Sequence, residues 1–140
     1  VGYMGGNRAN PSYEQVCAGV TNHAEIVAIT FDSNLISYRR LLEEFWEMHD
    51  PTSLNRQGGD IGTQYRSAIF TTSEAQLNEA LATKDIYQAL LTADGIGEIV
   101  TQIESAKPHP YWLAEDYHQK YLAKNPNGYD YHSSTGVLFP

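Results

Sequence analysis

The spacing of hydrophobic and polar positions changes from one segment to the next along the first half of the chain. Residues 24–31 (AEIVAITF) carry apolar side chains on both faces, a pattern that predicts a strand buried on both sides. After Ser37, apolar residues recur every three or four positions, which predicts a helix from Tyr38 to a stop at Pro51. A second strand is expected over residues 66–71, beyond a glycine-rich loop.

The second half continues with a helix and a strand. Ser73, with Gln76 three residues on, has the spacing of a capping box, and we expect a helix from there to about Leu91. Residues 98–104 (EIVTQIE) predict a third strand. Farther along, Tyr117 and Tyr121 are expected to share one face of a helix.

Helices and strands mixed in this way predict an α+β fold of two layers, with helices packed on a mixed sheet. The chain has 140 residues, of which 41% are hydrophobic, so we expect a single domain over residues 1–140. The short segment 1–3 runs at once into glycines, and a strand there needs a partner strand. We therefore expect the domain to be incomplete at its N-terminus.

Composition narrows the classes of partner. The net charge is −8 and the nine Lys and Arg residues are scattered, which argues against nucleic acid and membrane surfaces as partners. No apolar run approaches the ~20 residues that a membrane-spanning helix needs. Cys17 is the single cysteine, which excludes an intrachain disulfide and a paired-thiol metal site and favours a cytoplasmic location.

Two polar groups are candidates for chemistry. Glu25 lies at the entry of a strand predicted to be buried, where desolvation would raise its pKa and let it donate a proton; a glutamate that faces water is the alternative. Asp60 and Tyr65 lie in the loop 56–67, whose three glycines let the backbone approach a ligand; an aspartate that only caps a turn is the alternative. Tyrosines in expected loops add hydroxyl donors: Tyr3, Tyr13, Tyr65, Tyr111, Tyr129 and Tyr131.

Metal and nucleotide sites lack their usual patterns. Glu115 and His118 have the Glu-x-x-His spacing of di-iron helices, but the sequence holds no second such pair. The glycines of the loop do not follow a predicted strand in a phosphate-binding pattern. Cys17, between Val16 and Ala18, has the setting of a small buried residue rather than that of a nucleophile. We therefore expect neither a metal nor a cofactor.

Five segments resemble, in the same order, signatures of the A-type peptide methionine sulfoxide reductases. They are VGYMGG, PSYEQVCAGVTNHAE, FWEMHDPT, RQGGDIGTQYRSAIF and AEDYHQKYLAKNPNGY, and they are spread over nearly the whole chain. The resemblance implies the ferredoxin-like α+β core of that family, with its first strand and helix missing. It also implies reduction of the S epimer of methionine sulfoxide, free or in proteins, by a thiol mechanism with thioredoxin or a small thiol as reductant.

The resemblance also implies roles for single residues. Glu25 matches the family's general acid, which protonates the sulfoxide oxygen. Tyr13, Asp60 and Tyr65 match its substrate-binding groups; the hydroxyls of the tyrosines, with the neutral carboxyl group of Glu25, suit a strong acceptor oxygen. Cys17 matches a position at which family members often carry a non-catalytic cysteine.

The sequence departs from the family at its thiols. The family's nucleophile lies in a GCFWG motif before VGYxGG, and the 140 residues do not contain that motif. Asp130, Tyr131 and the GVLFP ending stand where resolving cysteines tend to lie. We therefore expect this chain alone to be inactive, as most of a reductase domain without its nucleophile. The alternative is a non-catalytic module that binds oxidised methionine.

Overall fold

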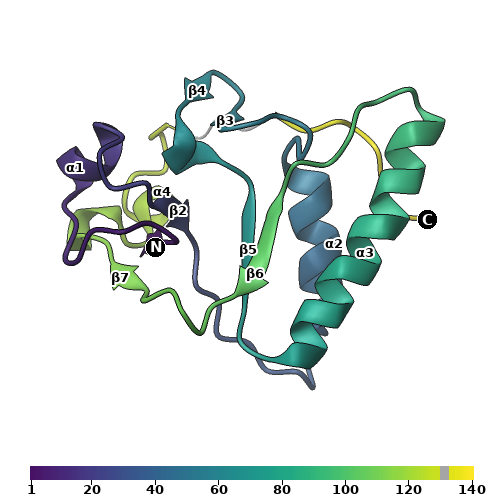
Figure 1. Cartoon of the computed structure of the whole chain (residues 1–140), viewed down its shortest axis with the longest axis horizontal. Coiled ribbons are helices and arrows are strands. Elements are labelled where there is room, and N and C mark those ends of the chain that lie inside the picture. The colour runs from purple at the N-terminus through teal and green to yellow at the C-terminus, as the bar shows by residue number, and fades with distance from the viewer. Residues whose placement is uncertain (130–132) are drawn as a thin grey trace.

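Helices and short strands alternate along the chain in the computed structural model, in which residues 1–129 and 133–140 are described (Figure 1). The strands are β1 (Gly2–Met4), β2 (Ala24–Ile26), β3 (Arg56–Gln57), β4 (Asp60–Ile61), β5 (Ala68–Thr71), β6 (Gln102–Ser105) and β7 (Trp112–Leu113). The helices are α1 (Tyr13–Cys17), α2 (Tyr38–Met48), α3 (Glu74–Ala93) and α4 (Tyr121–Lys124), with 3-10 helices η1 (Thr63–Tyr65) and η2 (Asp116–His118). The α+β class expected from the sequence is confirmed.

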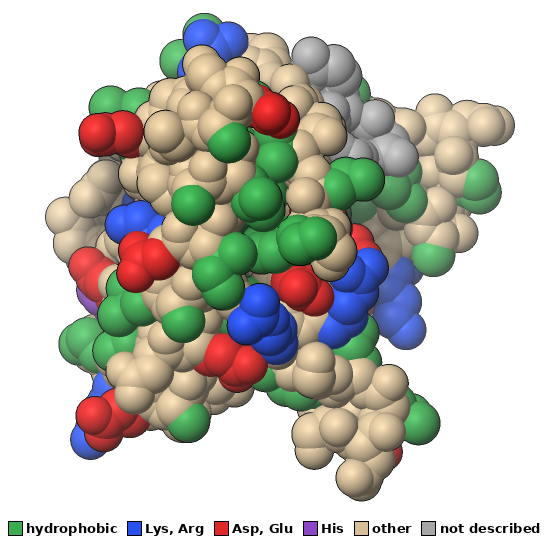
Figure 2. Space-filling model, turned by 90° about the vertical axis from the view of Figure 1, so that its right-hand side faces the viewer, with side chains coloured by type: hydrophobic (Ala, Val, Ile, Leu, Met, Phe, Trp, Pro, Cys, Tyr) green, Lys and Arg blue, Asp and Glu red, His purple; other side chains and the backbone are tan. Residues whose placement is uncertain are grey.

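The larger core forms where α2 and α3 pack together against the parallel pair of β5 and β6 (Figure 1). Its buried residues are Leu42, Trp46, Ala80, Tyr87, Leu91, Ile99 and Val137. The C-terminal segment closes this core, because the hydroxyl of Tyr87 donates a hydrogen bond to the carbonyl oxygen of Val137 at 2.8 Å. Figure 2 shows the outer side of this half, where hydrophobic side chains lie among acidic and basic ones.

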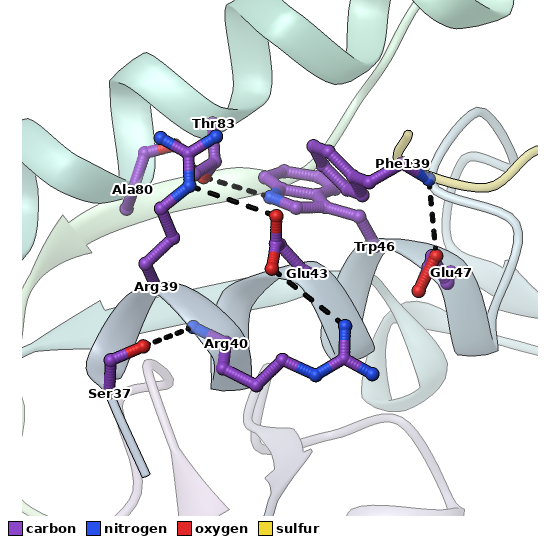
Figure 3. A network of polar contacts seen from close by, with 9 residues as sticks. All are labelled: Ser37, Arg39, Arg40, Glu43, Trp46, Glu47, Ala80, Thr83 and Phe139. Atoms are coloured by element: carbon purple, nitrogen blue, oxygen red, sulfur yellow. Dashed lines mark hydrogen bonds and ion pairs between the residues drawn. The ribbon is translucent and has the colours of Figure 1, made fainter.

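Polar contacts fix α2 at its start and at its buried face (Figure 3). The hydroxyl oxygen of Ser37 accepts a hydrogen bond from the backbone N–H of Arg40 at 3.0 Å, which makes Ser37 the N-cap that the sequence predicts. The indole N–H of Trp46 donates to the Thr83 hydroxyl of α3 at 3.1 Å. Both of these side chains are wholly buried, so the bond satisfies polar groups that water does not reach.

The smaller half is an antiparallel sheet in which β1 lies between β2 and β7. Tyr3 of β1 faces Glu25 of β2 on one side and Trp112 of β7 on the other. Tyr3 also packs with Val16 of α1 and with Ala114 in a second buried cluster. This packing places the short helix α1 beside the strand that carries Glu25.

The expectation of a strand over residues 24–31, buried on both sides, is wrong beyond Ile26. β1 offers only three residues as partners, so β2 ends after three. Val27 and Ile29 are 66% and 60% exposed. The described strands also form three small sheets rather than one mixed sheet.

Other boundaries move by a few residues. The second predicted strand begins at Ala68 rather than at residue 66, and the helix after Ser73 continues to Ala93. The third predicted strand begins only at Gln102. Before it, the N–H of Ile99 donates to the side chain of Gln88 and the N–H of Val100 to the carbonyl of Pro51, both at 2.8 Å, so neither amide pairs with a strand.

Tyr117 and Tyr121 do not share a helix, contrary to the sequence prediction. Tyr117 lies in η2 and Tyr121 begins α4. Lys120 between them has a φ of 51°, a left-handed conformation that interrupts a right-handed helix. Asp130 and Tyr131, expected in the place of a resolving cysteine, lie outside the described residues.

None of the helices formed by the described residues combines the length and the apolar character that crossing a bilayer requires.

Candidate functional site

The glycine-rich segment forms a tight hairpin followed by a 3-10 turn. β3 and β4 pair Gln57 with Asp60, and η1 then carries Tyr65. Gly62 joins the two with a φ of 147°, a conformation that other residues rarely adopt. A Cβ atom at Gly62 would lie 2.3 Å from Oε1 of Gln64, so the side chain of Gln64 occupies the space that this glycine leaves open.

Gln64 connects this segment to α1. Its side chain is buried, and its amide nitrogen donates a hydrogen bond to the backbone carbonyl of Cys17 at 3.2 Å. Cys17 ends α1, so the bond satisfies one of the carbonyl groups that a helix leaves open at its C-terminus. The element with Tyr65 and the helix with Tyr13 are therefore fixed to each other. The sequence prediction did not include Gln64 as a site residue, and only its place between Gly62 and Tyr65 could have indicated it.

Glu25 is half-buried on β2, and η1 packs against this strand. Burial raises the pKa of the Glu25 carboxyl group above its ordinary value, and the charge of Asp60 raises it further. The raised pKa that the sequence predicts for Glu25 is confirmed. The alternative, a glutamate that simply faces water, does not agree with this burial.

The two predicted phenols stay protonated at neutral pH. A hydrogen bond and a Coulombic interaction with Cys17 raise the pKa of Tyr13, and burial adds to them. For Tyr65, burial comes first among the causes that raise the pKa, and the charge of Glu25 follows. Both hydroxyl groups therefore keep the proton that a hydrogen-bond donor needs.

The charge of Asp60 raises the pKa values of Glu25 and Tyr65, and the charge of Glu25 raises those of Tyr13 and Tyr65, although the four residues come from four different elements. The structure thus brings together all four residues that the sequence singled out. The Glu25 carboxyl group, which tends to keep its proton, and the two phenols present O–H donors side by side. Such an arrangement suits a ligand with a strongly accepting oxygen atom that gains a proton during reaction.

Tyr129 reaches this group from the C-terminal segment. Its hydroxyl donates a hydrogen bond to Oδ2 of Asp60 at 3.0 Å, while the side chain stays 63% exposed. The sequence indicated Tyr129 only as one of several loop tyrosines. No local pattern connected it with Asp60, because 69 residues separate the two.

Cys17 lies among these residues, but at the wrong end of a helix for a nucleophile. It is the last residue of α1, whereas a helix dipole favours a thiolate at the N-terminus. Its thiol is free and only partly buried. The geometry therefore agrees with the sequence interpretation that Cys17 is not the attacking thiol.

Glu115 and His118, the pair with metal-ligand spacing, make other contacts. The two carboxylate oxygens of Glu115 accept hydrogen bonds from Tyr3, Tyr13 and Tyr117. The ring of His118 packs between Tyr13 and Tyr117, with centroid distances of 4.4 and 4.2 Å. Over residues 1–129 and 133–140, no three His, Cys, Asp or Glu side chains gather closely enough to hold a metal ion.

Comparison with protein families gives a match over residues 1–137 to the family described as peptide methionine sulfoxide reductase. Among curated proteins, the peptide methionine sulfoxide reductase MsrA of Pseudomonas putida strain W619 is 56% identical over 140 residues, and that of Streptomyces griseus is 54% identical over the same length. The alignments cover the whole chain but 62% and 63% of these relatives. The chain therefore spans about three fifths of the length of the curated relatives it matches.

Solved structures agree with this comparison. Methionine sulfoxide reductase A of Corynebacterium diphtheriae superposes with a TM-score of 0.87 and 44% identity, over 99% of this chain and 68% of that one. The reduced form of Mxr1 from Saccharomyces cerevisiae superposes with a TM-score of 0.83 and 37% identity, over 95% of this chain and 76% of that one.

Proposed function

The chain belongs to the peptide methionine sulfoxide reductase family, and on that premise we propose that its site takes part in reducing the S epimer of methionine sulfoxide, free or in proteins, to methionine. The observation that carries the proposal is the half-buried Glu25, whose pKa is raised by burial and by Asp60, with the phenols of Tyr13 and Tyr65 beside it. The sulfoxide oxygen is a strong acceptor, and these three groups offer it hydrogen bonds.

In the proposed reaction a thiolate attacks the sulfoxide sulfur while Glu25 transfers its proton to the oxygen. The attack forms a sulfur–sulfur bond. This bond and the sulfur–oxygen bond of the substrate then break as the hydroxyl oxygen becomes bonded to the thiol sulfur, which leaves a sulfenic acid and methionine. A second thiol then reduces the sulfenic acid, which gives a disulfide and water. Two thiols thus supply the two electrons, and we propose thioredoxin or a small thiol as their final source. Tyr13 and Tyr65 would stabilise charge on the oxygen as its bond to sulfur weakens.

We assign no nucleophilic role to Cys17, the single cysteine of the 140 residues. It ends α1, away from the helix terminus that favours a thiolate. The 140 residues alone would then show no turnover of a methionine S-sulfoxide peptide with dithiothreitol. Activity is expected when a segment with a GCFWG-type cysteine is joined to them. Turnover by the 140 residues that Cys17→Ser abolishes would contradict the assignment.

A binding module for oxidised methionine is the second candidate, because Glu25, Asp60 and Tyr65 form the same site whether or not a thiol is supplied. The two candidates differ in the joined protein. A reductase turns over once the GCFWG-type segment is present, whereas a binding module takes up the sulfoxide and leaves it unchanged.

Binding to the 140-residue chain tests the site that both candidates share. Calorimetry would compare three peptides of one sequence, with methionine S-sulfoxide, methionine R-sulfoxide or unoxidised methionine at the same position. We expect the S-sulfoxide peptide to bind most tightly, and Tyr65→Phe to weaken its binding by about 5-fold, the loss of one hydrogen bond to the oxygen. Equal affinity for all three peptides would overturn the proposal.

The cellular location is a separate proposal. We propose that the protein works in the cytoplasm, where thiols are kept reduced and a single free cysteine is compatible with the redox state. Fractionation of cells that express it, with an antibody against the chain, would test this.

A further inference from the structure

Glu115 joins β1, the strand that pairs with the strand of Glu25, to α1, the helix that carries Tyr13. One carboxylate oxygen accepts a hydrogen bond from the hydroxyl of Tyr3 at 3.0 Å. The other accepts one from the backbone N–H of Tyr13 at 2.9 Å. Tyr3 lies directly opposite Glu25 in the sheet, so Glu115 connects the strand beside Glu25 to the helix of Tyr13.

The contact to Tyr13 lies where α1 most needs a partner. Tyr13 is the first residue of the helix, and its N–H belongs to the group of amides that have no partner within a helix. Ser12 and Gln15 form a local capping box. The backbone N–H of Gln15 donates to the Ser12 hydroxyl at 3.2 Å, and the backbone N–H of Ser12 donates to the side-chain oxygen of Gln15 at 3.0 Å. The Tyr13 amide is left to Glu115, which lies 102 residues away in sequence.

The hydrogen bonds to Glu115 are charge-assisted. Burial would raise the pKa of this carboxyl group, but hydrogen bonds from the backbone of Tyr13 and from the Tyr3 hydroxyl outweigh it, and the pKa is lowered. Glu115 is therefore a carboxylate at neutral pH, and hydrogen bonds to a charged acceptor are shorter and stronger than neutral ones.

The position of Tyr13 depends on such outside contacts. α1 has five residues, too few to be stable as a helix without packing. Val16 anchors its buried side in the cluster with Tyr3, and Gln64 holds its last carbonyl. Glu115 holds the backbone of Tyr13, while the ring of His118 at 4.4 Å and a hydrogen bond with the Cys17 side chain contact its phenol.

We propose that Glu115 is a positioning residue, which holds Tyr13 where its hydroxyl meets the sulfoxide oxygen. The proposal rests on the proposed function for the role of that hydroxyl, but the placement of Tyr13 is tested without it. Glu115→Ala removes the hydrogen bonds from Tyr3, Tyr13 and Tyr117 and leaves α1 attached through Val16 and Gln64. Glu115→Gln keeps an acceptor for the Tyr13 amide and an N–H that donates to the Tyr3 oxygen, so it restores the geometry without the charge.

The first measurement follows Tyr13 directly and needs no substrate. In the 140-residue chain labelled with [ζ-¹³C]tyrosine, the Tyr13 resonance is identified by its loss in Tyr13→Phe. We expect Glu115→Ala to move this resonance toward the value of a tyrosine in an unfolded peptide, and Glu115→Gln to restore most of the wild-type shift. An unchanged Tyr13 resonance in folded Glu115→Ala overturns the proposal, whatever the activity of the protein.

The second measurement is a double-mutant cycle on the dissociation constant for the methionine S-sulfoxide peptide. We expect Tyr13→Phe and Glu115→Ala each to weaken binding by about 5-fold, and the double variant to weaken it by about 5-fold rather than by the product of the two. Independent, multiplicative effects would overturn the proposal. If the wild-type chain does not bind the peptide, the proposed function fails, while the tyrosine resonance still decides the role of Glu115.

Two matched variants separate positioning from charge and from stability. Glu14→Gln removes an exposed carboxylate from the same helix, and we expect neither readout to change. Thr83→Val removes the buried hydrogen bond to Trp46 in the other core, so it lowers the melting temperature without moving the Tyr13 resonance. If Thr83→Val moves that resonance as Glu115→Ala does, the effect is one of stability and the proposal is overturned.

Discussion

The hydroxyl of Tyr129 donates a hydrogen bond to Oδ2 of Asp60 at 3.0 Å, and Asp60 in turn raises the pKa of Glu25. The C-terminal segment is thereby connected with the proposed acid of the site. Asp60 accepts this bond, and its Coulombic interaction favours the protonated form of Glu25. Of the two neighbouring carboxyl groups, Asp60 is thus the hydrogen-bond acceptor and Glu25 the one that tends to keep its proton.

Asp60→Asn should lower the pH at which Glu25 loses its proton. Removing the charge removes one of the causes that raise the pKa of Glu25, so Glu25 loses its proton at a lower pH. Affinity for the methionine S-sulfoxide peptide should fall as pH rises through this pKa, with a lower midpoint in the variant. Peptide affinity measured between pH 5 and 9 tests this. Asp85→Asn, an exposed change of equal charge on α3, should leave the midpoint in place, and a midpoint that rises in Asp60→Asn contradicts the mechanism.

Glu25→Gln should stabilise the protein while it weakens the site. A raised pKa in the folded state means that ionised Glu25 is less favourable there than in the unfolded chain. Wild type therefore loses stability as pH rises from the ordinary value of 4.5 through the folded pKa, and the glutamine variant does not. Melting temperatures should coincide near pH 4 and differ by a few degrees at pH 7.5. A variant that melts lower at pH 7.5 would mean that the Glu25 carboxylate stabilises the fold.

Local sequence signals account for the helix starts and for the composition of the site. Ser37 caps α2 and Ser73 caps α3, each by accepting the N–H three residues on, as spacing alone predicts. The capping box at Ser73 is only half formed, since Gln76 accepts from the N–H of Thr72 instead. Local patterns indicated Glu25, Asp60 and Tyr65, because a carboxylate in a strand predicted to be buried and a glycine-rich loop each restrict the chemistry, whereas the role of Tyr13 came only from the family resemblance.

Long-range contacts account for what the sequence could not show. The strand predicted over residues 24–31 stops at Ile26 because its partner β1 is short. The sequence of one strand does not predict the length of the strand that pairs with it. Tyr129 and Glu115 join the site through hydrogen bonds across 69 and 102 residues. No periodicity within either segment carries that information, which depends on how the chain returns to the first sheet.

Gly62→Ala should loosen the contact between η1 and α1. The new Cβ would meet the buried side chain of Gln64 at 2.3 Å, and a φ of 147° is strained for alanine. Moving Gln64 gives up its hydrogen bond to the Cys17 carbonyl. We expect a loss of about 1 to 3 kcal/mol in the free energy of unfolding, together with weaker binding of the sulfoxide peptide. Urea unfolding monitored by circular dichroism measures the first quantity.

Gly59→Ala is the matched control for that change. It lies three residues earlier in the same hairpin, and a Cβ there would meet nothing within 4 Å. We expect stability and affinity close to those of wild type. Equal losses of stability and affinity in the two variants would show that the hairpin needs glycine for its backbone flexibility. The contact of Gly62 with the Gln64 side chain would then not explain the effect.

His49 should make the protein less stable in mild acid. Its ring is buried at the end of α2, with Nδ1 2.6 Å from the carbonyl oxygen of Phe45 and Nε2 2.7 Å from the hydroxyl of Ser67. Burial lowers the pKa of His49 below its ordinary value of 6.5, so the unfolded chain takes up a proton more readily than the folded one. The stability that neutral His49 provides is complete above pH 6.5 and is lost as pH falls from there through the folded pKa.

Substitutions at His49 and at its partner Ser67 separate the effect of titration from the effect of the hydrogen bond between them. His49→Gln keeps polar atoms that reach Phe45 and Ser67 but does not titrate, so the free energy of unfolding should fall less than in wild type between pH 7 and pH 5. Ser67→Ala removes the partner of Nε2 and leaves the imidazole, so it should lower stability at every pH and retain the wild-type slope. Urea unfolding at half-unit steps of pH gives both slopes. A slope in His49→Gln as steep as that of wild type would assign the acid sensitivity to other groups, because only a group that changes its proton content on unfolding contributes to it.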